Sequence, residues 1–221
     1  MNTNIAAKQL NIYQILGLDD MNMEDVSDFL EQEAEKHFID CRNWSSEYPY
    51  HPLTIFTIAR SALYLYVDYF VRCNFLRAVN YTNNSPVADD SCVELFLRVP
   101  GSDEYWNFEF NCIGTVNASH RVVRPAPTRL TDGQIASIKV YASCGTRPFE
   151  EVEGLFAWNL TVAIPFSLIG LDGHKLPEYV LGNFCKCAQK TGMPHFLSWS
   201  PIATEHPDFH RPEFFGKLYF K

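Results

Sequence analysis

The sequence is poor in basic residues and has no long apolar run. Its 18 lysines and arginines stand against 26 aspartates and glutamates, which gives a formal net charge of -8. Binding to nucleic-acid phosphates or to an anionic membrane needs a surplus of positive charge, so we expect neither partner. The longest apolar stretches, such as residues 160–166 (LTVAIPF), fall far short of the roughly 20 residues of a membrane span. A neutral or cationic ligand fits this composition better.

The sequence also lacks a signal peptide's apolar block and a disulfide framework. Residues 1–11 (MNTNIAAKQLN) contain no such block, and we therefore expect a cytoplasmic location. The seven cysteines are odd in number and have no framework spacing, which favours reduced, buried thiols. Cys185 and Cys187 form a C-x-C pair, which is a weak metal signal because no second pair accompanies it.

Aromatic residues are abundant, at 14% of the chain, and they favour β-strands, where flat rings pack on a pleated surface. Turn-rich pieces such as NNSPVADD, PGSDE and LDGHKLP separate the strand-like segments. These segments lie at residues 54–70 (two strands around Ser61), 75–81, 91–99, 105–113, 134–143, 155–164 and 183–189, with a closing strand KLYF. Many short strands with little helix predict a mainly β chain folded as an antiparallel β-sandwich over residues 41–221.

One amphipathic helix is expected near the N-terminus. Residues 23–40 carry apolar side chains at helical spacing, with acidic residues early and Lys36 and His37 late, as the helix dipole prefers. We expect residues 1–40 to form an extension that contains this helix and packs on the main domain.

Two strand-like segments place carboxylates at positions that alternation assigns to one face. In YWNFEFN, one face carries Trp106, Phe108 and Phe110, and the other carries Tyr105, Asn107, Glu109 and Asn111. That second face is either solvated surface or a binding surface. In SCVELFL, Glu94 shares a side with Cys92 and Phe96, so we expect it to point inward and to need a cationic partner, available as Arg77, Arg121 or Arg124.

Four stretches resemble a known family: RNWSSEYPYHP (42–52), ADDSCVELFLRVPGSDEYWNFEFNCIGT (88–115), WNLTVAIPFSLIG (158–170) and PHFLSWSPIATEHPDFHRPEFFGKLYF (194–220). They resemble the carbohydrate-binding family 9-like proteins of gut Bacteroidetes, which are related to xylanase-borne family 9 modules. The resemblance spans about residues 41–221. It implies a DOMON-like β-sandwich, non-catalytic binding of plant or dietary polysaccharide fragments, and a link to enzymes that degrade xylan and other glycans. The xylanase-borne modules clamp a terminal sugar between two tryptophans and carry structural calcium.

A pyranose has a flat C–H face and a ring of hydroxyls, so a sugar site needs an aromatic platform and planar polar groups. Alternation places Trp158 among core residues, whereas Trp44 and Trp106 are better placed to be partly exposed, although either could equally plug the end of the sandwich. The candidate carbohydrate-binding residues are therefore Trp44, Arg77, Glu94, Trp106, Glu109, Asn111 and Arg121. No catalytic residue is assigned.

The closing stretch SWSPIATEHPDFHRPEFF raises the question of a metal site, because His206, Asp208 and His210 alternate and Glu213 follows. Pro207 and Pro212 bracket these residues, and no serine here lies in a G-x-S-x-G elbow. We favour a structural role, in which the prolines stiffen a return loop that closes the sandwich.

Three other functions stay open. A metal-assisted glycoside hydrolase would use paired carboxylates, yet the acidic cluster Asp89, Asp90 and Glu94 is explained with fewer demands by structural calcium. Haem binding through Met193 and His195 would require axial ligands on opposite sides of the macrocycle, which such close neighbours do not supply. An interaction domain without a small-molecule site is the third.

Overall fold

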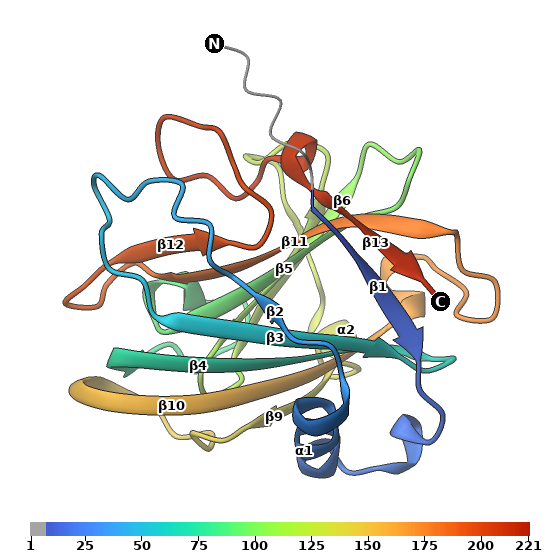
Figure 1. Cartoon of the computed structure of the whole chain (residues 1–221), viewed down its shortest axis with the longest axis horizontal. Helices are drawn as coiled ribbons and strands as arrows, with labels where there is room; N and C mark the ends of the chain where they lie inside the picture. The colour runs from blue at the N-terminus through green and yellow to red at the C-terminus, as the bar shows by residue number, and fades with distance from the viewer. Residues whose placement is uncertain (1–7) are drawn as a thin grey trace.

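The computed structural model describes residues 8–221, and it shows two β-layers packed face to face with a helix on the outside of one (Figure 1). The first layer contains β5 (Cys92–Arg98), β6 (Tyr105–Asn111), β7 (Val116–Arg121), β8 (Thr128–Arg129), β11 (Tyr179–Ala188), β12 (His195–Ser198) and β13 (Gly216–Phe220). The second contains β2 (His37–Phe38), β3 (Leu53–Arg60), β4 (Tyr64–Ala78), β9 (Lys139–Ala142) and β10 (Phe149–Pro165). The predicted β-sandwich is thus confirmed.

Strand β1 (Gln9–Gln14) joins the two layers into one curled sheet. Its first residues pair in parallel with β13, and its last two, Tyr13 and Gln14, pair in parallel with β3. The other pairings within residues 8–221 are antiparallel. The segment expected to be an N-terminal extension therefore also contributes a strand to the sheet.

The predicted helix is present as α1 (Met23–Glu33), and it ends earlier than the sequence pattern indicated. Asn22 caps its start by accepting hydrogen bonds from the backbone N–H groups of Glu24 and Asp25. Ala34 is already extended, so Lys36 and His37 lie beyond the helix. Helix α1 packs on the outer side of the second layer, against β10, β9, β3 and β4 (Figure 1). Within residues 8–221, no helix has the length and apolar character needed to cross a membrane.

The expectation of a strand over residues 134–143 is only half right. Residues Asp132–Ile135 form the short helix α2, and the strand β9 starts at Lys139. The reason is local: Thr131 and Gln134 form a capping box, in which each side chain bonds the other's backbone N–H, and this fixes a helical turn. The predicted strand at 75–81 is the end of the 15-residue strand β4. Single-turn 3₁₀ helices lie at Leu18–Asp20, Val87–Asp89, Phe166–Ile169 and Pro212–Phe214.

The main core lies between the layers. Phe56 of β3 and Phe184 of β11 stack with ring centroids 3.8 Å apart, and Trp199 packs edge-on to both. Trp158 is 1% exposed, which confirms its predicted place in the core. A second apolar cluster, which we call the outer cluster, lies on the far side of the first layer: Trp44, Val87, Cys92, Phe96, Tyr105, Cys185, Cys187, Ile202, Phe209 and Phe215. The return loop, residues 199–215, contributes the last three of these side chains and so covers this face.

Candidate functional site

The outer side of β5 and β6 carries two carboxylates beneath the return loop. Glu94 and Glu109 are direct cross-strand partners, and they are 4% and 8% exposed. Alternation along β6 places Glu109 with Tyr105 and Asn107, on the side opposite Phe108. Glu94 is buried as expected, but it lies on the covered outer face and not between the layers.

Amide and thiol groups, and not an arginine, hydrogen-bond these carboxylates. Asn107 Nδ2 donates to Glu94 Oε2 over 3.3 Å, and the Cys187 thiol donates to Glu94 Oε1 over 3.2 Å. Asn117 Nδ2 donates to Glu109 Oε2 over 3.0 Å. Burial raises the pKa of Glu94 well above its ordinary value, and the neighbouring Cys187 and Glu109 raise it further. Burial also raises the pKa of Glu109.

Arg121, at the end of β7, acts on this polar face through its charge. Its charge lowers the pKa of Glu109, although less than burial raises it. The guanidinium donates to the Arg124 carbonyl over 3.1 Å and to the Ser119 hydroxyl. In the described part of the chain its buried Nε has no hydrogen-bond partner.

The return loop supplies polar groups as well as cover. Arg124 pairs with Asp208 over 3.2 Å, and Asp208 Oδ1 accepts the backbone N–H of His210. His210 Nδ1 lies 3.1 Å from the Tyr105 hydroxyl. Burial, together with the charges of Arg121 and Arg124, lowers the pKa of His210 to about 3, so its imidazole is neutral at physiological pH.

These groups surround a cleft of about 180 Å³ between the sheet and the return loop. Its polar wall is formed by Glu94, Glu109, Arg124, Asp208 and His210, and its apolar wall by Phe196 and Phe209. Residues from β5, β6, β12 and the return loop therefore meet at one opening. The cleft can bind a small polar molecule that presents hydroxyls to the carboxylates and an apolar face to the phenylalanines.

The structure brings together only part of the predicted site. Glu94 and Glu109 line the cleft, and Arg121 lies beside it. Trp44 is 4% exposed and its indole N–H donates to the Thr204 carbonyl, so of the two placements left open for this ring the structure shows a buried one. Trp106 is half-buried, but it packs on the core side of β6, beside Phe108 and His120 and away from Glu109.

Arg77 and Asn111 belong to a different cluster, centred on the buried Asp90. Arg77 Nε lies 3.3 Å from Asp90 Oδ1, and Asn111 Nδ2 donates to Asp90 Oδ2 over 3.0 Å. Asp90 also accepts the backbone N–H groups of Val79 and Asn80. This network holds the chain between β4 and β5 and does not reach the cleft residues.

The sequence-based list of site residues omitted four that line the cleft, Arg124, Phe196, Asp208 and His210, and two that hydrogen-bond its carboxylates, Asn107 and Asn117. Asn107 was placed on the correct face by alternation but was not singled out. Asp208 and His210 lie in the return loop, to which only a structural role was given. The loop has that role, and in addition it lines the cleft.

The residues of the two possible cation sites that the sequence raised do not converge. Asp89 pairs with Lys190 over 2.9 Å, Asp90 with Arg77, and Glu94 with Asn107 and Cys187, so these three carboxylates do not share one centre. They therefore do not fit the shared structural calcium ion suggested for this acidic cluster. His206, Asp208 and His210 also do not converge, since His210 bonds Tyr105 and Asp208 bonds Arg124.

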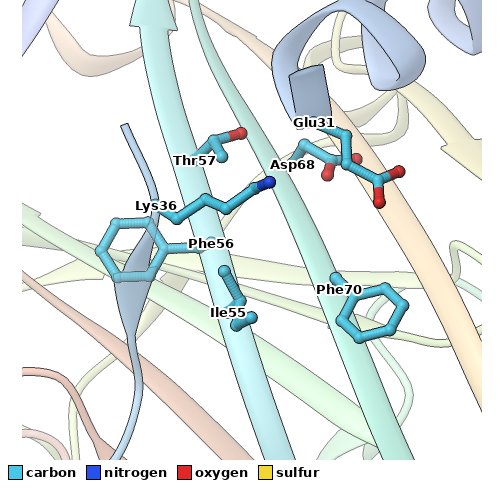
Figure 2. Close-up of a pocket in the computed structure, with 7 residues that line it drawn as sticks. All are labelled: Glu31, Lys36, Ile55, Phe56, Thr57, Asp68 and Phe70. Atoms are coloured by element: carbon cyan, nitrogen blue, oxygen red, sulfur yellow. The ribbon is translucent and has the colours of Figure 1, made fainter. Parts of the chain in front are cut away.

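A second cavity, of about 130 Å³, lies under α1 on the other layer, and Figure 2 shows Lys36 reaching across it towards Thr57 and Asp68. Asp68 is 2% exposed, and its Oδ1 accepts hydrogen bonds from Ser27 of α1 and Thr161 of β10. Burial raises the pKa of Asp68 to about 6, although both hydroxyls act in the opposite direction. The chain's own helix and hydroxyls cover this carboxylate.

Comparison with known proteins agrees with this geometry. The model of the carbohydrate-binding family 9 matches residues 24–220, so the chain belongs to that family. A Bacteroides uniformis protein, provisionally assigned to carbohydrate binding, is similar at 34% identity and a TM-score of 0.91, over 98% of this chain and 100% of that one. No curated protein matches the chain significantly.

A family 9 carbohydrate-binding module from Caldicellulosiruptor kristjanssonii shares the fold. In complex with glucose it matches with a TM-score of 0.55 at 14% identity, over 97% of this chain and 96% of that one. In complex with cellotriose the TM-score is 0.53, again at 14% identity, over 97% and 94%.

Proposed function

We propose that this chain binds the end of an oligo- or polysaccharide of plant or dietary origin, without cleaving it, in the cleft between the first layer and the return loop. The observation that carries the proposal is the pair Glu94 and Glu109. The two carboxylates lie on neighbouring strands, are buried and hydrogen-bonded by amide groups, and line the cleft. Burying two carboxylates is unfavourable unless donors satisfy them, and a sugar's hydroxyls are such donors.

The size and walls of the cleft favour a single sugar ring. Its volume of about 180 Å³ is below the roughly 300 Å³ at which pockets for drug-sized ligands begin. Phe196 and Phe209 offer an apolar wall, in place of the tryptophan platform expected from the sequence. The neutral His210 adds a hydrogen-bonding ring to the polar wall, and Arg124 adds a cationic donor.

Isothermal titration calorimetry tests the proposal. The full chain is titrated with glucose, xylose, cellobiose, xylobiose and mannobiose at pH 7. We expect saturable binding of at least one sugar, with a preference that identifies the polysaccharide. Flat titrations across the whole panel would remove the support for saccharide binding.

A carboxylate pair is also the catalytic unit of glycoside hydrolases, and two raised pKa values in one cleft are compatible with a general acid. Family 9 modules are typically non-catalytic, so we expect no hydrolysis. Incubating the chain with xylo- and cello-oligosaccharides and measuring new reducing ends decides between the two. If the chain is non-catalytic, its proposed partners are enzymes that degrade the same glycan.

A further inference from the structure

Two neighbouring strands of the first layer place three thiols and a carboxylate on the same covered face. Strands β5 and β11 run side by side (Figure 1), with Cys92 opposite Cys187 and Glu94 opposite Cys185. Alternation puts all four side chains on one side of the sheet. The three cysteines are fully buried and Glu94 is 4% exposed.

The donor atoms of three of these residues are close enough to share one ion. The Sγ atoms of Cys92 and Cys187 and a carboxylate oxygen of Glu94 all lie within 4.8 Å of one another. The Cys187 Sγ to Glu94 Oε1 distance is 3.2 Å. Zinc bonds of about 2.3 Å to sulfur and about 2.0 Å to oxygen place tetrahedral ligand atoms roughly 3.5 Å apart. Small side-chain adjustments therefore suffice to close the site.

Within residues 8–221, Glu94 forms no ion pair with a lysine or arginine. Lys186 lies between Cys185 and Cys187 in sequence but points to the other side of β11, where its Nζ is 3.0 Å from His195 Nε2. By contrast, Asp90, just before β5, is paired with Arg77.

We propose that Cys92, Glu94 and Cys187 form a binding site for a thiophilic divalent ion of the zinc type. Two metal–sulfur bonds and one metal–oxygen bond form, and the two thiol protons pass to solvent, as does the Glu94 proton when that carboxyl is protonated. Soft thiolates select zinc over calcium or magnesium. Glu94 also lines the cleft, so the cleft gives the ion access and a water molecule there completes its tetrahedral coordination.

Cadmium is the probe, because cadmium–thiolate bonds absorb in the near ultraviolet. Reduced, metal-free full-length chain is titrated with cadmium chloride in the absence of any sugar. We expect a charge-transfer band that saturates at one ion per chain and is displaced by zinc. If the reduced chain develops no such band, the proposal is overturned, whatever its variants do.

Variants locate the ion. Cys92→Ser and Cys187→Ser should each abolish saturable binding at one equivalent, whereas Cys41→Ser and Cys144→Ser should leave the band unchanged. The two control residues are half-buried cysteines outside the group. If the charge-transfer band disappears in Cys41→Ser or Cys144→Ser but not in Cys92→Ser or Cys187→Ser, the ion binds elsewhere and the proposed site is contradicted. Circular dichroism of each variant confirms that the fold is retained.

The metal proposal and the saccharide proposal can be tested independently of each other. Saccharide titrations carried out with a chelator test the cleft alone, and cadmium titrations without sugar test the thiol group alone. As a second readout, zinc should raise the melting temperature of the unmodified chain but not that of Cys92→Ser. An equal shift in both would contradict the assignment.

Discussion

The outer faces of the two layers each contain buried carboxylates, and different elements cover them. Each keeps a buried carboxylate on a strand: Asp68 on β4, and Glu94 with Glu109 on β5 and β6. Helix α1 covers Asp68, and Ser27 and Thr161 donate hydroxyls to it. The return loop covers the glutamates but leaves a cleft beside them. Both covers leave a cavity, of about 130 Å³ beside Asp68 and about 180 Å³ beside the glutamates, and the one under the loop has the more polar lining.

The largest expected effect comes from removing a side chain that packs between the first layer and the return loop. Trp44→Ala removes a buried ring from the outer cluster together with the hydrogen bond to Thr204, at a cost of about 3–5 kcal/mol in the free energy of unfolding. It should also weaken saccharide binding, because the return loop loses its anchor. Urea unfolding and calorimetry measure both effects.

The matched control is Leu30→Ala, since Leu30 of α1 is fully buried against the second layer. Its cost should be similar, about 2–5 kcal/mol, but saccharide binding should be unchanged at a temperature where the variant is folded. Equal loss of binding in both variants would show that global stability, and not the loop, controls the cleft.

Next in size is the effect of neutralising one carboxylate on ligand affinity. Glu109→Gln removes a charged acceptor that faces the cleft, and hydrogen bonds to charged groups contribute about 2 kcal/mol, so the dissociation constant should rise about 30-fold. Asp68→Asn, the same change on the covered face, should leave affinity unaltered. Calorimetric titration measures the dissociation constant of both variants. A raised dissociation constant for Asp68→Asn would contradict the conclusion that the saccharide binds beside Glu109 and not beside Asp68.

Asp68→Asn should instead change how stability depends on pH. The folded-state pKa of Asp68, about 6, is above its unfolded value of 3.8, so the native state binds this proton more tightly. The stability of the unmodified chain therefore falls as the pH rises from about 4 to about 6. The variant lacks this loss of stability, and its relative gain should be absent below pH 4 and reach up to about 3 kcal/mol above pH 7.

Urea unfolding at several pH values measures that dependence. The introduced amide can still accept from Ser27 and Thr161, so little hydrogen bonding is lost. Glu94 and Glu109 retain their raised pKa values in this variant and contribute an unchanged background. A variant whose stability follows that of the unmodified chain at every pH would show that Asp68 does not titrate as described.

The smallest expected effect concerns the cap of α1. Asn22→Ala removes the side chain that accepts from two backbone N–H groups, at a cost of about 1 kcal/mol. Asn22→Ser keeps a capping oxygen and should recover most of that loss. Hydrogen exchange should be faster in α1 while the strands around the cleft stay protected, and faster exchange in β5 or β6 would show that the two covers are coupled.

Local pattern predicted much of the fold. Period-two alternation correctly divided β6 into a face with Phe108 and a face with Glu109, and the helix predicted over residues 23–40 is present as far as Glu33. The pattern failed where a short-range contact overrode it, as in the capping box of Thr131 and Gln134. It left open the placement of Trp44, whose burial depends on Thr204 and Phe209, about 160 residues further along the chain.

The sequence by itself determined the strand content, the negative charge, the two glutamates on one side of their strands and the family to which the chain belongs. Only the tertiary structure decided that this side faces the return loop, that Cys92 lies opposite Cys187, and that Arg77 and Asn111 serve Asp90 elsewhere. The physical reason is that alternation is a property of adjacent residues. Which face is covered, and by what, depends on pairings between strands distant in the chain.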